Sequence, residues 1–298
     1  MNVRGAETDR ALALPDGRTL AYSDLGDPDG HPCLFFHGIP GSRRQPGLIA
    51  GVAAAARLRV IGIDRPGYGG STFQRGRRLL DWPRDVSRLA DALGLRGFSV
   101  VGLSGGAGYA LACAAAMPER VAAAVVLSGM GPLDDPAMGP MIGELSRGLR
   151  AGARLARRMP RVAARLLARG VARDAALPDP IGRWASQMAP ADRALLARPE
   201  VARALLDDLD ETMRGGPIGM AWDLTLCALP WGFQLAEITT PVLLWHGEDD
   251  WNVPPAFGRG LALALRNCRA WYWPGEGHLA SLSHADEVVA ALSATLAS

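Results

Sequence analysis

The chain has 298 residues, of which 49% are hydrophobic and 21% charged, and its formal net charge is only +2. This composition is typical of a globular protein and excludes disorder, collagen or a coiled coil as the main class. The small net charge, with both signs mixed along most of the chain, argues against nucleic acid as the principal partner. All 32 basic residues are arginines, which excludes Schiff-base or phosphate-loop chemistry that uses a lysine.

The cysteines are too far apart in the sequence to form a CxxC pair, so we expect no metal or redox site built on them. They are Cys33, Cys113, Cys227 and Cys268. The N-terminal stretch contains no apolar signal segment, and no run reaches the roughly 18 apolar residues that a membrane span needs. We therefore expect reduced thiols, a cytoplasmic location and no membrane-spanning helix.

The predicted elements begin with a hairpin, in which strands at 11–14 and 19–23 flank the turn signal Pro15-Asp16-Gly17. Continuous apolar runs then alternate with helix-like segments, a pattern typical of strands covered on both faces. The predicted strands are 33–36, 60–63, 99–103, 121–127, 242–245 and 271–273, and the predicted helices are 48–57, 84–93, 108–117, 255–265 and 285–296. This alternation predicts an α/β fold with a mostly parallel central sheet flanked by helices.

The segment between the strands at 121–127 and 242–245 interrupts the alternation, since it contains no clear strand and looks helical. We expect a helical cap at 132–235, inserted over the carboxyl edge of the sheet, with 1–131 and 236–298 forming the core domain. Within the cap, arginines recur every three or four residues and are predicted to share one helical face. They are Arg147, Arg150, Arg154, Arg157, Arg161, Arg165 and Arg169. This face is interpreted as solvated, with an anionic substrate or a membrane surface as alternatives.

The sharpest motif is Gly102-Leu103-Ser104-Gly105-Gly106, which matches G-x-S-x-G between a predicted strand and a predicted helix. In so tight a turn, side chains at Gly102 and Gly106 would collide with neighbouring backbone, and glycine leaves the Ser104 hydroxyl exposed. The following helix directs its amide groups toward a developing oxyanion. Ser104 is therefore the candidate nucleophile, and the alternative is an inert serine in a glycine-rich turn.

A serine nucleophile needs a base, and an acid that holds this base. Among five histidines, His278 lies in a loop between the last predicted strand and the last predicted helix, where it can reach the carboxyl edge of the sheet. We take it as the candidate base. The loop after the strand at 242–245 supplies three candidate acids, Glu248, Asp249 and Asp250.

Together these motifs resemble the α/β-hydrolase family. The resemblance implies that the acid is Asp250, which occupies the D of the family pattern G-x-x-D-x-x-V-P read from Gly247; Asp249 is the alternative. The order Ser104, Asp250, His278 also matches the family order of nucleophile, acid and base. The resemblance covers the chain up to about residue 127 and again from about residue 242, but not the cap.

Two further segments support the resemblance. His37-Gly38-Ile39-Pro40-Gly41 is similar to the HGxP loop of the family, which implies an oxyanion hole formed by the amides of Ile39 and Gly105. His37 is expected to brace this loop, and contact with substrate is its other possible role. The segment from Asp64 to Ser71 resembles the Gly-x-Gly-x-Ser turn of the family and is expected to shape the rim of the active site.

These residues predict a serine hydrolase that cleaves a hydrophobic carboxylic ester through an acyl-enzyme, without a cofactor or metal. In the related epoxide hydrolases and haloalkane dehalogenases the nucleophile is Asp, so Ser104 favours acyl transfer over alkyl transfer. The expected partner is a small hydrophobic acyl compound. Trp184, Trp222 and Trp231 are candidates for lining its pocket, or belong to the core of the cap itself. The sequence leaves the oligomeric state open.

Other functions use the same motifs. A proline-iminopeptidase-like aminopeptidase would hold a substrate ammonium with cap carboxylates; the candidates, which otherwise are solvated helix charges, are Asp207, Asp208, Asp210 and Glu211. A thioesterase or cyclase in a biosynthetic pathway would use the same catalytic residues, so the sequence does not separate it from an esterase. A non-catalytic ligand receptor on the same fold is the remaining alternative, against which the complete set Ser104, Asp250 and His278 argues.

Overall fold

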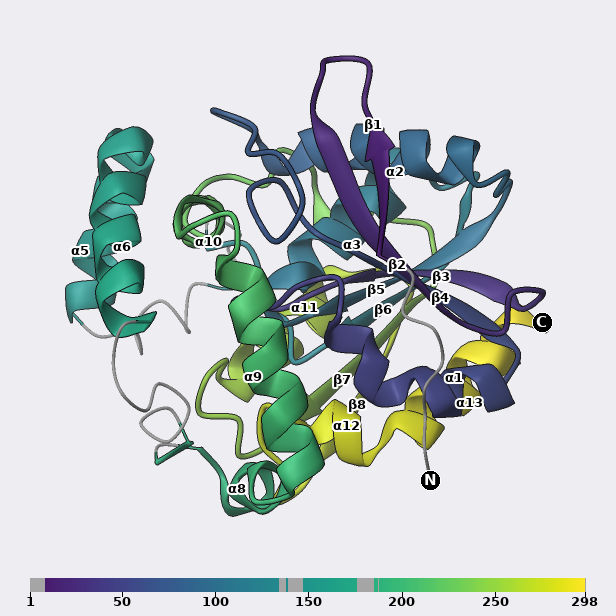
Figure 1. Ribbon diagram of the computed structural model, residues 1–298. Helices are drawn as coiled ribbons and strands as arrows, with labels where there is room; N and C mark the ends of the chain where they lie inside the picture. The colour runs from purple at the N-terminus through teal and green to yellow at the C-terminus, as the bar shows by residue number, and fades with distance from the viewer. Residues whose placement is uncertain (1–8, 134–137, 139–146, 176–184, 187, 298) are drawn as a thin grey trace.

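The computed structural model describes residues 9–133, 138, 147–175, 185–186 and 188–297 (Figure 1). Its centre is an eight-stranded sheet in the order β1-β2-β4-β3-β5-β6-β7-β8. The two N-terminal strands run antiparallel to their neighbours, and every pairing from β4 through β3 to β8 is parallel. The strands are β1 Arg10–Ala13, β2 Thr19–Gly26, β3 His31–Phe36, β4 Leu58–Ile63, β5 Phe98–Leu103, β6 Val121–Leu127, β7 Val242–Gly247 and β8 Cys268–Trp273. The predicted α/β class with a mostly parallel sheet is confirmed.

Helices cover both faces of this sheet, which explains why the central strands are apolar without interruption. One core contains side chains from α2, α3 and α11, and a second core, on the opposite face, contains side chains from α1 and α13. The helices outside the segment between β6 and β7 are α1 Ala50–Ala55, α2 Trp82–Ala92, α3 Ala107–Ala116, α11 Pro255–Ala264, α12 Ala280–Ser283 and α13 Ala285–Leu296. Short 3₁₀ turns are η1 Gln45–Ile49, η2 Leu79–Asp81, η3 Ser104–Gly106 and η5 Leu235–Glu237.

The element boundaries differ from the prediction by a few residues. The predicted helix at 48–57 is a 3₁₀ turn followed by the short helix α1. Helix α2 begins at Trp82, two residues earlier than predicted, because Pro83 is accommodated in the first helical turn, where its missing N–H leaves no hydrogen bond unmade. Strand β2 continues to Gly26 because it pairs with β4 along Tyr22 to Gly26, a partner that the hairpin pattern alone does not indicate.

Between β6 and β7 the described residues form helices and no strand, in keeping with the predicted helical segment. They are α5 Arg147–Arg158, α6 Pro160–Ala175, α8 Pro190–Leu196, α9 Pro199–Met213 and α10 Ile218–Leu226. The prediction of a single arginine face is wrong, because the row divides between α5 and α6. Pro160 cannot donate the hydrogen bond that would continue α5, and it begins the next helix instead. In the part of the chain that the structure describes, no helix is long and apolar enough to cross a membrane.

Candidate active site

The turn after β5 holds Ser104 in a left-handed backbone conformation, with a φ of 53°. Such a conformation is strained for a residue with a side chain and is characteristic of functional turns. A Cβ at Gly102 would lie 2.5 Å from the carbonyl oxygen of Gly106, and a Cβ at Gly106 would lie 2.1 Å from that of Phe36. Both glycines are thus required by close backbone approach, as the sequence motif predicts.

The strand order decides what surrounds Ser104. Strand β5 lies between β3 and β6, so the loop after β3 is on one side of Ser104 and the loops after β6, β7 and β8 are on the other. Leu103 pairs with Leu127, which puts Ser128 next to Ser104 along the sheet edge. The Ser128 hydroxyl donates to the carbonyl oxygen of His278 at 3.4 Å. The loop that carries His278 therefore reaches the edge one strand from Ser104.

His278 and Asp250 form a buried hydrogen-bonded pair, with 2.7 Å between Nδ1 and Oδ2. The other carboxylate oxygen of Asp250 accepts the amides of Asn252 and Val253, each at 2.9 Å. Burial alone would raise the pKa of Asp250, but its interactions with His278 and His246 hold this pKa well below the usual range. Asp250 is therefore a carboxylate at neutral pH, oriented to stabilise a protonated imidazole.

The structure brings Asp250 to the histidine, whereas the neighbouring candidate Asp249 is exposed. The amide of Asp249 donates to the carbonyl of Glu276, so its role in the structure is to join the β7 loop to the His278 loop. The Ser104 hydroxyl forms no hydrogen bond with any residue that the structure describes. The link between nucleophile and base is thus not closed in this conformation.

The loop after β3 packs directly on the serine turn. A Cβ at Gly105 would lie 2.4 Å from side-chain atoms of Ile39, so these two predicted oxyanion residues are in contact. His37 is fully buried; its Nδ1 donates to the carbonyl of Gly38 at 2.9 Å and its Nε2 accepts the amide of Arg65 at 3.2 Å. Burial, and then the charge of Arg65, hold the pKa of His37 well below its usual range. His37 is a neutral brace of the loop.

Ser104 lines a narrow cavity of about 20 Å³, which is enough for one water molecule. Trp231 lines it together with Leu79, Gly108, Tyr109, Met130, Asp223, Leu226 and Cys227. Trp222 lies elsewhere, in a separate cavity with Phe73, and its indole N–H donates to the carbonyl of Arg77 at 3.1 Å. Trp184 lies outside the described residues. His37 is not among the described residues that line the cavity at Ser104.

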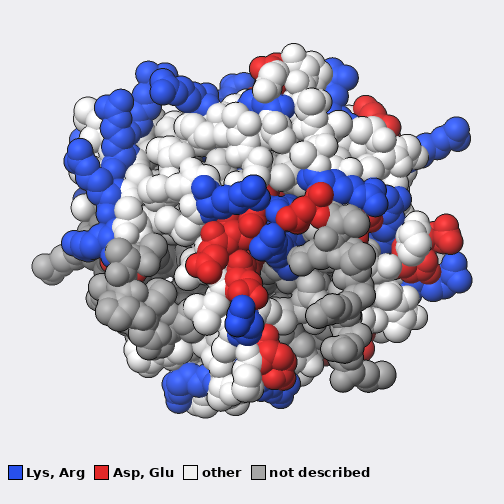
Figure 2. All heavy atoms as spheres, viewed as in Figure 1, with Lys and Arg blue, Asp and Glu red and all other residues white. Residues whose placement is uncertain are grey.

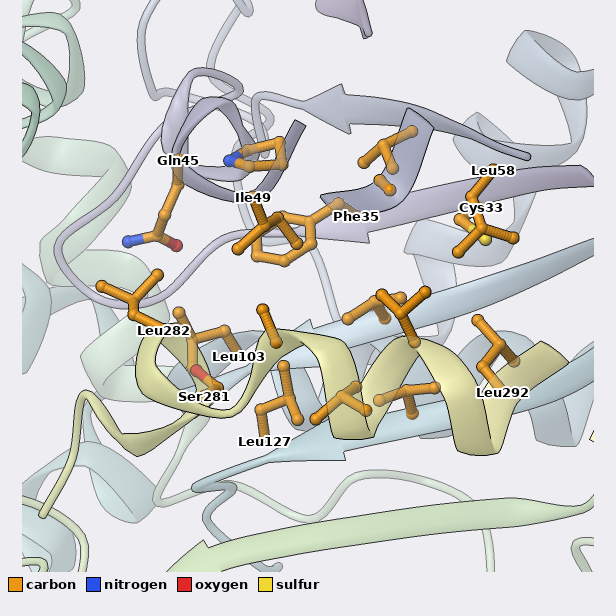
Figure 3. Close-up of a pocket in the computed structure, with 18 residues that line it drawn as sticks. Cys33, Phe35, Gln45, Ile49, Leu58, Leu103, Leu127, Ser281, Leu282 and Leu292 are labelled. Atoms are coloured by element: carbon orange, nitrogen blue, oxygen red, sulfur yellow. The ribbon is translucent and has the colours of Figure 1, made fainter. Parts of the chain in front are cut away.

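A second cavity, of about 50 Å³, lies under α13 on the other face of the sheet (Figure 3). Its lining is almost entirely apolar, with Phe35 and Leu103 from the strands and Leu292 from α13. Ser104 is not part of this lining, and the cavity is smaller than a ligand pocket. We assign it to imperfect packing between the sheet and α13.

Three buried aspartates contact the loops of the site: Asp192 and Asp223 were missed by the sequence analysis, and Asp208 was considered there only as a ligand for a substrate ammonium. Each comes from a different helix between β6 and β7, and each reaches a different loop of the sheet edge. Asp192 of α8 accepts the backbone amides of His278 and Leu279 at 2.8 and 2.9 Å. Asp208 of α9 accepts the amide and hydroxyl of Ser42, at 2.9 and 2.5 Å.

The third, Asp223 of α10, is the centre of a buried charge cluster. It binds Arg65 at 2.7 Å and also accepts from Arg77, while the hydroxyls of Tyr68 and Tyr109 donate at 3.0 and 2.5 Å. Against the effect of burial, the two guanidinium groups lower the pKa of Asp223. The sequence signal for such a cluster was available, because Asp223 is the only charged residue of an otherwise apolar helix.

No group of His, Cys, Asp and Glu side chains within the described ranges is arranged to hold a metal ion. The arrangement combines an imidazole oriented by a carboxylate, a serine on a strained turn, and backbone amides beside it, which are groups suited to nucleophilic catalysis.

A sequence model of the alpha/beta hydrolase fold matches residues 32–285, so the chain belongs to the alpha/beta hydrolase fold family. Among curated proteins it is similar to a non-heme chloroperoxidase of Streptomyces lividans, with 38% identity over 41% of this chain and 45% of the relative. It is also similar to a proline iminopeptidase of Neisseria gonorrhoeae, with 32% identity over 37% of this chain and 36% of the relative. These matches span less than half the length of either relative.

Solved structures resemble the whole fold. A hydrolase from Pseudomonas aeruginosa PA01 has a TM-score of 0.71 at 22% identity and covers 98% of this chain and 100% of its own. An esterase from Rhodococcus sp. ECU1013 has a TM-score of 0.69 at 23% identity, covering 97% of this chain and 98% of its own. At such identities the likeness shows the fold alone.

Proposed function

We propose that the protein is a serine hydrolase that cleaves a hydrophobic carboxylic ester with Ser104 as nucleophile, His278 as base and Asp250 as the acid that orients it. The observation that carries the proposal is the buried hydrogen bond of 2.7 Å between His278 and Asp250, one strand from a serine with a φ of 53°. Membership of the alpha/beta hydrolase fold family supports an enzymatic role. We further propose that the helices between β6 and β7 act as the cap.

The proposed reaction has two halves. His278 takes the Ser104 proton as the hydroxyl oxygen attacks the ester carbonyl, and the amides of Ile39 and Gly105 stabilise the oxyanion that forms. The ester C–O bond then breaks, the alcohol leaves with the proton from His278, and the acyl group remains on Ser104. Water, deprotonated by His278, attacks this acyl group and releases the carboxylic acid while the proton returns to Ser104.

Most of the residues that line the cavity at Ser104 are apolar, which favours a hydrophobic substrate. The cavity is narrow, so binding an acyl group requires movement of a lining side chain such as Trp231. A small acyl group is therefore the proposed substrate class.

An aminopeptidase of the kind named for the Neisseria relative is the second candidate, because its matched region shares 32% identity. It would need a free carboxylate in the cap for the substrate ammonium. Two of the predicted candidates already have partners, since Asp208 accepts from Ser42 and Glu211 pairs with Arg43. Asp223 lines the cavity at Ser104, yet two arginines neutralise it. These contacts favour an ester over an aminoacyl amide as the substrate.

The first test is labelling with a fluorophosphonate, followed by mass spectrometry of the modified peptide. We expect one adduct, on Ser104, and no adduct in Ser104→Ala. Turnover of short-chain aryl esters by Ser104→Ala should fall by about 10⁴-fold or more, because the covalent step is lost. Ser293→Ala, on the remote helix α13, is the matched control. Labelling elsewhere, or full activity of Ser104→Ala, would contradict the proposal.

The same preparation distinguishes the candidate substrates. Short and long acyl esters, acyl thioesters and a prolyl amide are compared by kcat/KM, and halide-dependent peroxidase activity is measured alongside. We expect the short hydrophobic esters to be preferred. A preference for the prolyl amide would select the aminopeptidase, and cyclised or thioester-derived products would select the biosynthetic alternative.

A further inference from the structure

The helices α5 and α6 form a hairpin whose charge is opposite to that of the rest of the molecule. Residues 147–173 contain nine arginines and no acidic residue. Because the whole chain has 32 basic and 30 acidic residues, the remainder has seven more acidic than basic residues. Figure 2 shows the arginines as a blue band over the corner where Figure 1 draws α5 and α6. We call this pair of helices the basic hairpin.

Most of these charges have no counterion among the residues that the structure describes. Of the hairpin arginines whose side chains the structure describes, five are exposed and form no ion pair or hydrogen bond with a described residue: Arg154, Arg158, Arg161, Arg165 and Arg169. Among the described residues, Arg173 has one ion-pair contact, of 3.7 Å, with the exposed Asp174. Elsewhere, by contrast, Arg43 binds three carboxylates and Arg59 binds Asp24. Like charges on one surface repel each other unless an anionic partner is present.

The basic hairpin also exposes large apolar side chains among its arginines. Met159 is 52% exposed and Leu166 50%. The inner face of α6 carries the small buried residues Ala163 and Ala164, and α6 packs against α10. Apolar and cationic side chains therefore share the outer surface of the hairpin, which is the composition of a helix that lies in a bilayer interface.

We propose that the basic hairpin is a docking surface for an anionic lipid bilayer. The arginines bind the phosphate groups of anionic headgroups, and Met159 and Leu166 enter the boundary between headgroups and acyl chains. The acidic remainder of the molecule is repelled by the same surface, so the charge distribution orients the protein with the hairpin toward the membrane. This surface is independent of Ser104, and it stands whether or not the proposed ester hydrolysis is correct.

The test measures co-sedimentation of the full chain with phosphatidylcholine vesicles and with equimolar phosphatidylcholine–phosphatidylglycerol vesicles. We expect at least tenfold tighter binding to the anionic vesicles, weakening as salt is raised. The triple variant R158E/R165E/R169E should bind the anionic vesicles at least tenfold more weakly than the wild type does. The matched control is R84E/R88E/R96E, which reverses three exposed arginines on and after α2 and should change the affinity less than twofold. Circular dichroism verifies that all variants are folded.

A second pair of variants separates a bilayer from a soluble polyanion. M159S/L166S should weaken binding to anionic vesicles at least threefold and leave binding to heparin unchanged. The control L206S/L263S changes two other exposed leucines and should bind vesicles as the wild type does. The proposal is overturned by equal binding to both kinds of vesicle, by equal losses in the two triple variants, or by an M159S/L166S variant that binds anionic vesicles as tightly as the wild type does.

Discussion

Arg65 connects the buried charge cluster with the proposed oxyanion hole. Its guanidinium donates to the carbonyls of His37 and Gly38, the latter at 3.0 Å, and to Asp223 at 2.7 Å. The carbonyl of Gly38 and the amide of Ile39 belong to one planar peptide group. A cation on the carbonyl oxygen therefore both orients this peptide and polarises the amide that would bind the oxyanion.

Replacing Arg65 should impair catalysis more than substrate binding. For Arg65→Gln we expect kcat to fall by about 10- to 100-fold with little change in KM, a smaller loss than the roughly 10²–10³ for removing an oxyanion donor itself. Steady-state kinetics on the folded variant measure this split. Arg77→Gln is the control, because Arg77 binds the same Asp223 but forms no hydrogen bond with a described residue of the loop after β3. Equal kcat losses in both variants would assign Arg65 a purely structural role.

At the scale of elements, helix α9 is attached to the oxyanion loop through Asp208. Besides its bonds to Ser42, the carboxylate receives the side-chain amide of Gln45 at 3.4 Å, and the oxygen of Gln45 accepts the amide of Gly38 at 2.7 Å. A shift of α9 therefore acts on the backbone beside Ile39. Helix α8 is attached in a similar way to the His278 loop through Asp192. The position of these helices is thus linked to the geometry on both sides of Ser104.

The protonation of Asp208 should make stability depend on pH. Burial outweighs the hydrogen bonds from Ser42 and raises the pKa of Asp208 to about 7. Between about pH 4 and pH 7 the native state keeps a proton that the unfolded chain has released, so this group's contribution to the free energy of unfolding increases as pH falls. As pH falls from about 7 to about 4, the free energy of unfolding of the wild type should increase by about 2–4 kcal/mol relative to that of Asp208→Asn.

Urea unfolding at a series of pH values measures the difference. Asp207→Asn is the control, since Asp207 is an exposed neighbour paired only with Arg203, and its stability profile should run parallel to that of the wild type. A parallel profile for Asp208→Asn as well would show that the carboxyl is ionised throughout this pH range.

At the scale of the whole molecule, buried charges join the helices between β6 and β7 to the sheet. Asp223, Arg65 and Arg77 are almost completely buried, and they come from both parts. Removing one partner of a buried ion pair leaves the other charge uncompensated. The two parts should therefore unfold together, in one transition.

Asp223→Asn tests this coupling. We expect it to lower the free energy of unfolding by about 3–5 kcal/mol, because two arginines lose their carboxylate. Asp210→Asn, in an exposed position of α9, should change it by less than about 0.5 kcal/mol. Differential scanning calorimetry follows both variants and the wild type, for which a single transition is expected. Two separate transitions in the wild type, or an unchanged stability of Asp223→Asn, would contradict the coupling.

The sequence by itself determined the local features of the protein. Continuous apolar strands indicated a sheet covered on both faces, and the glycines around Ser104 indicated the strained turn. Both features could be predicted because residues adjacent in the sequence determine them. The pairing of Asp250 with His278 was reached through a resemblance and agrees with the contact that is observed. The periodic spacing of the arginines from 147 to 169 predicted one helix, although Pro160 indicated that one helix ends and another begins there.

Only the tertiary structure decided which distant side chains share one site. Asp192, Asp208 and Asp223 look like ordinary helix charges in the sequence, and each becomes a ligand of a loop more than fifty residues away. Likewise, Trp231 lines the cavity at Ser104 whereas Trp222 lines a separate one, and the sequence does not distinguish the two. A residue's own neighbours determine its backbone conformation, but burial and charge pairing depend on what the folded chain brings beside it.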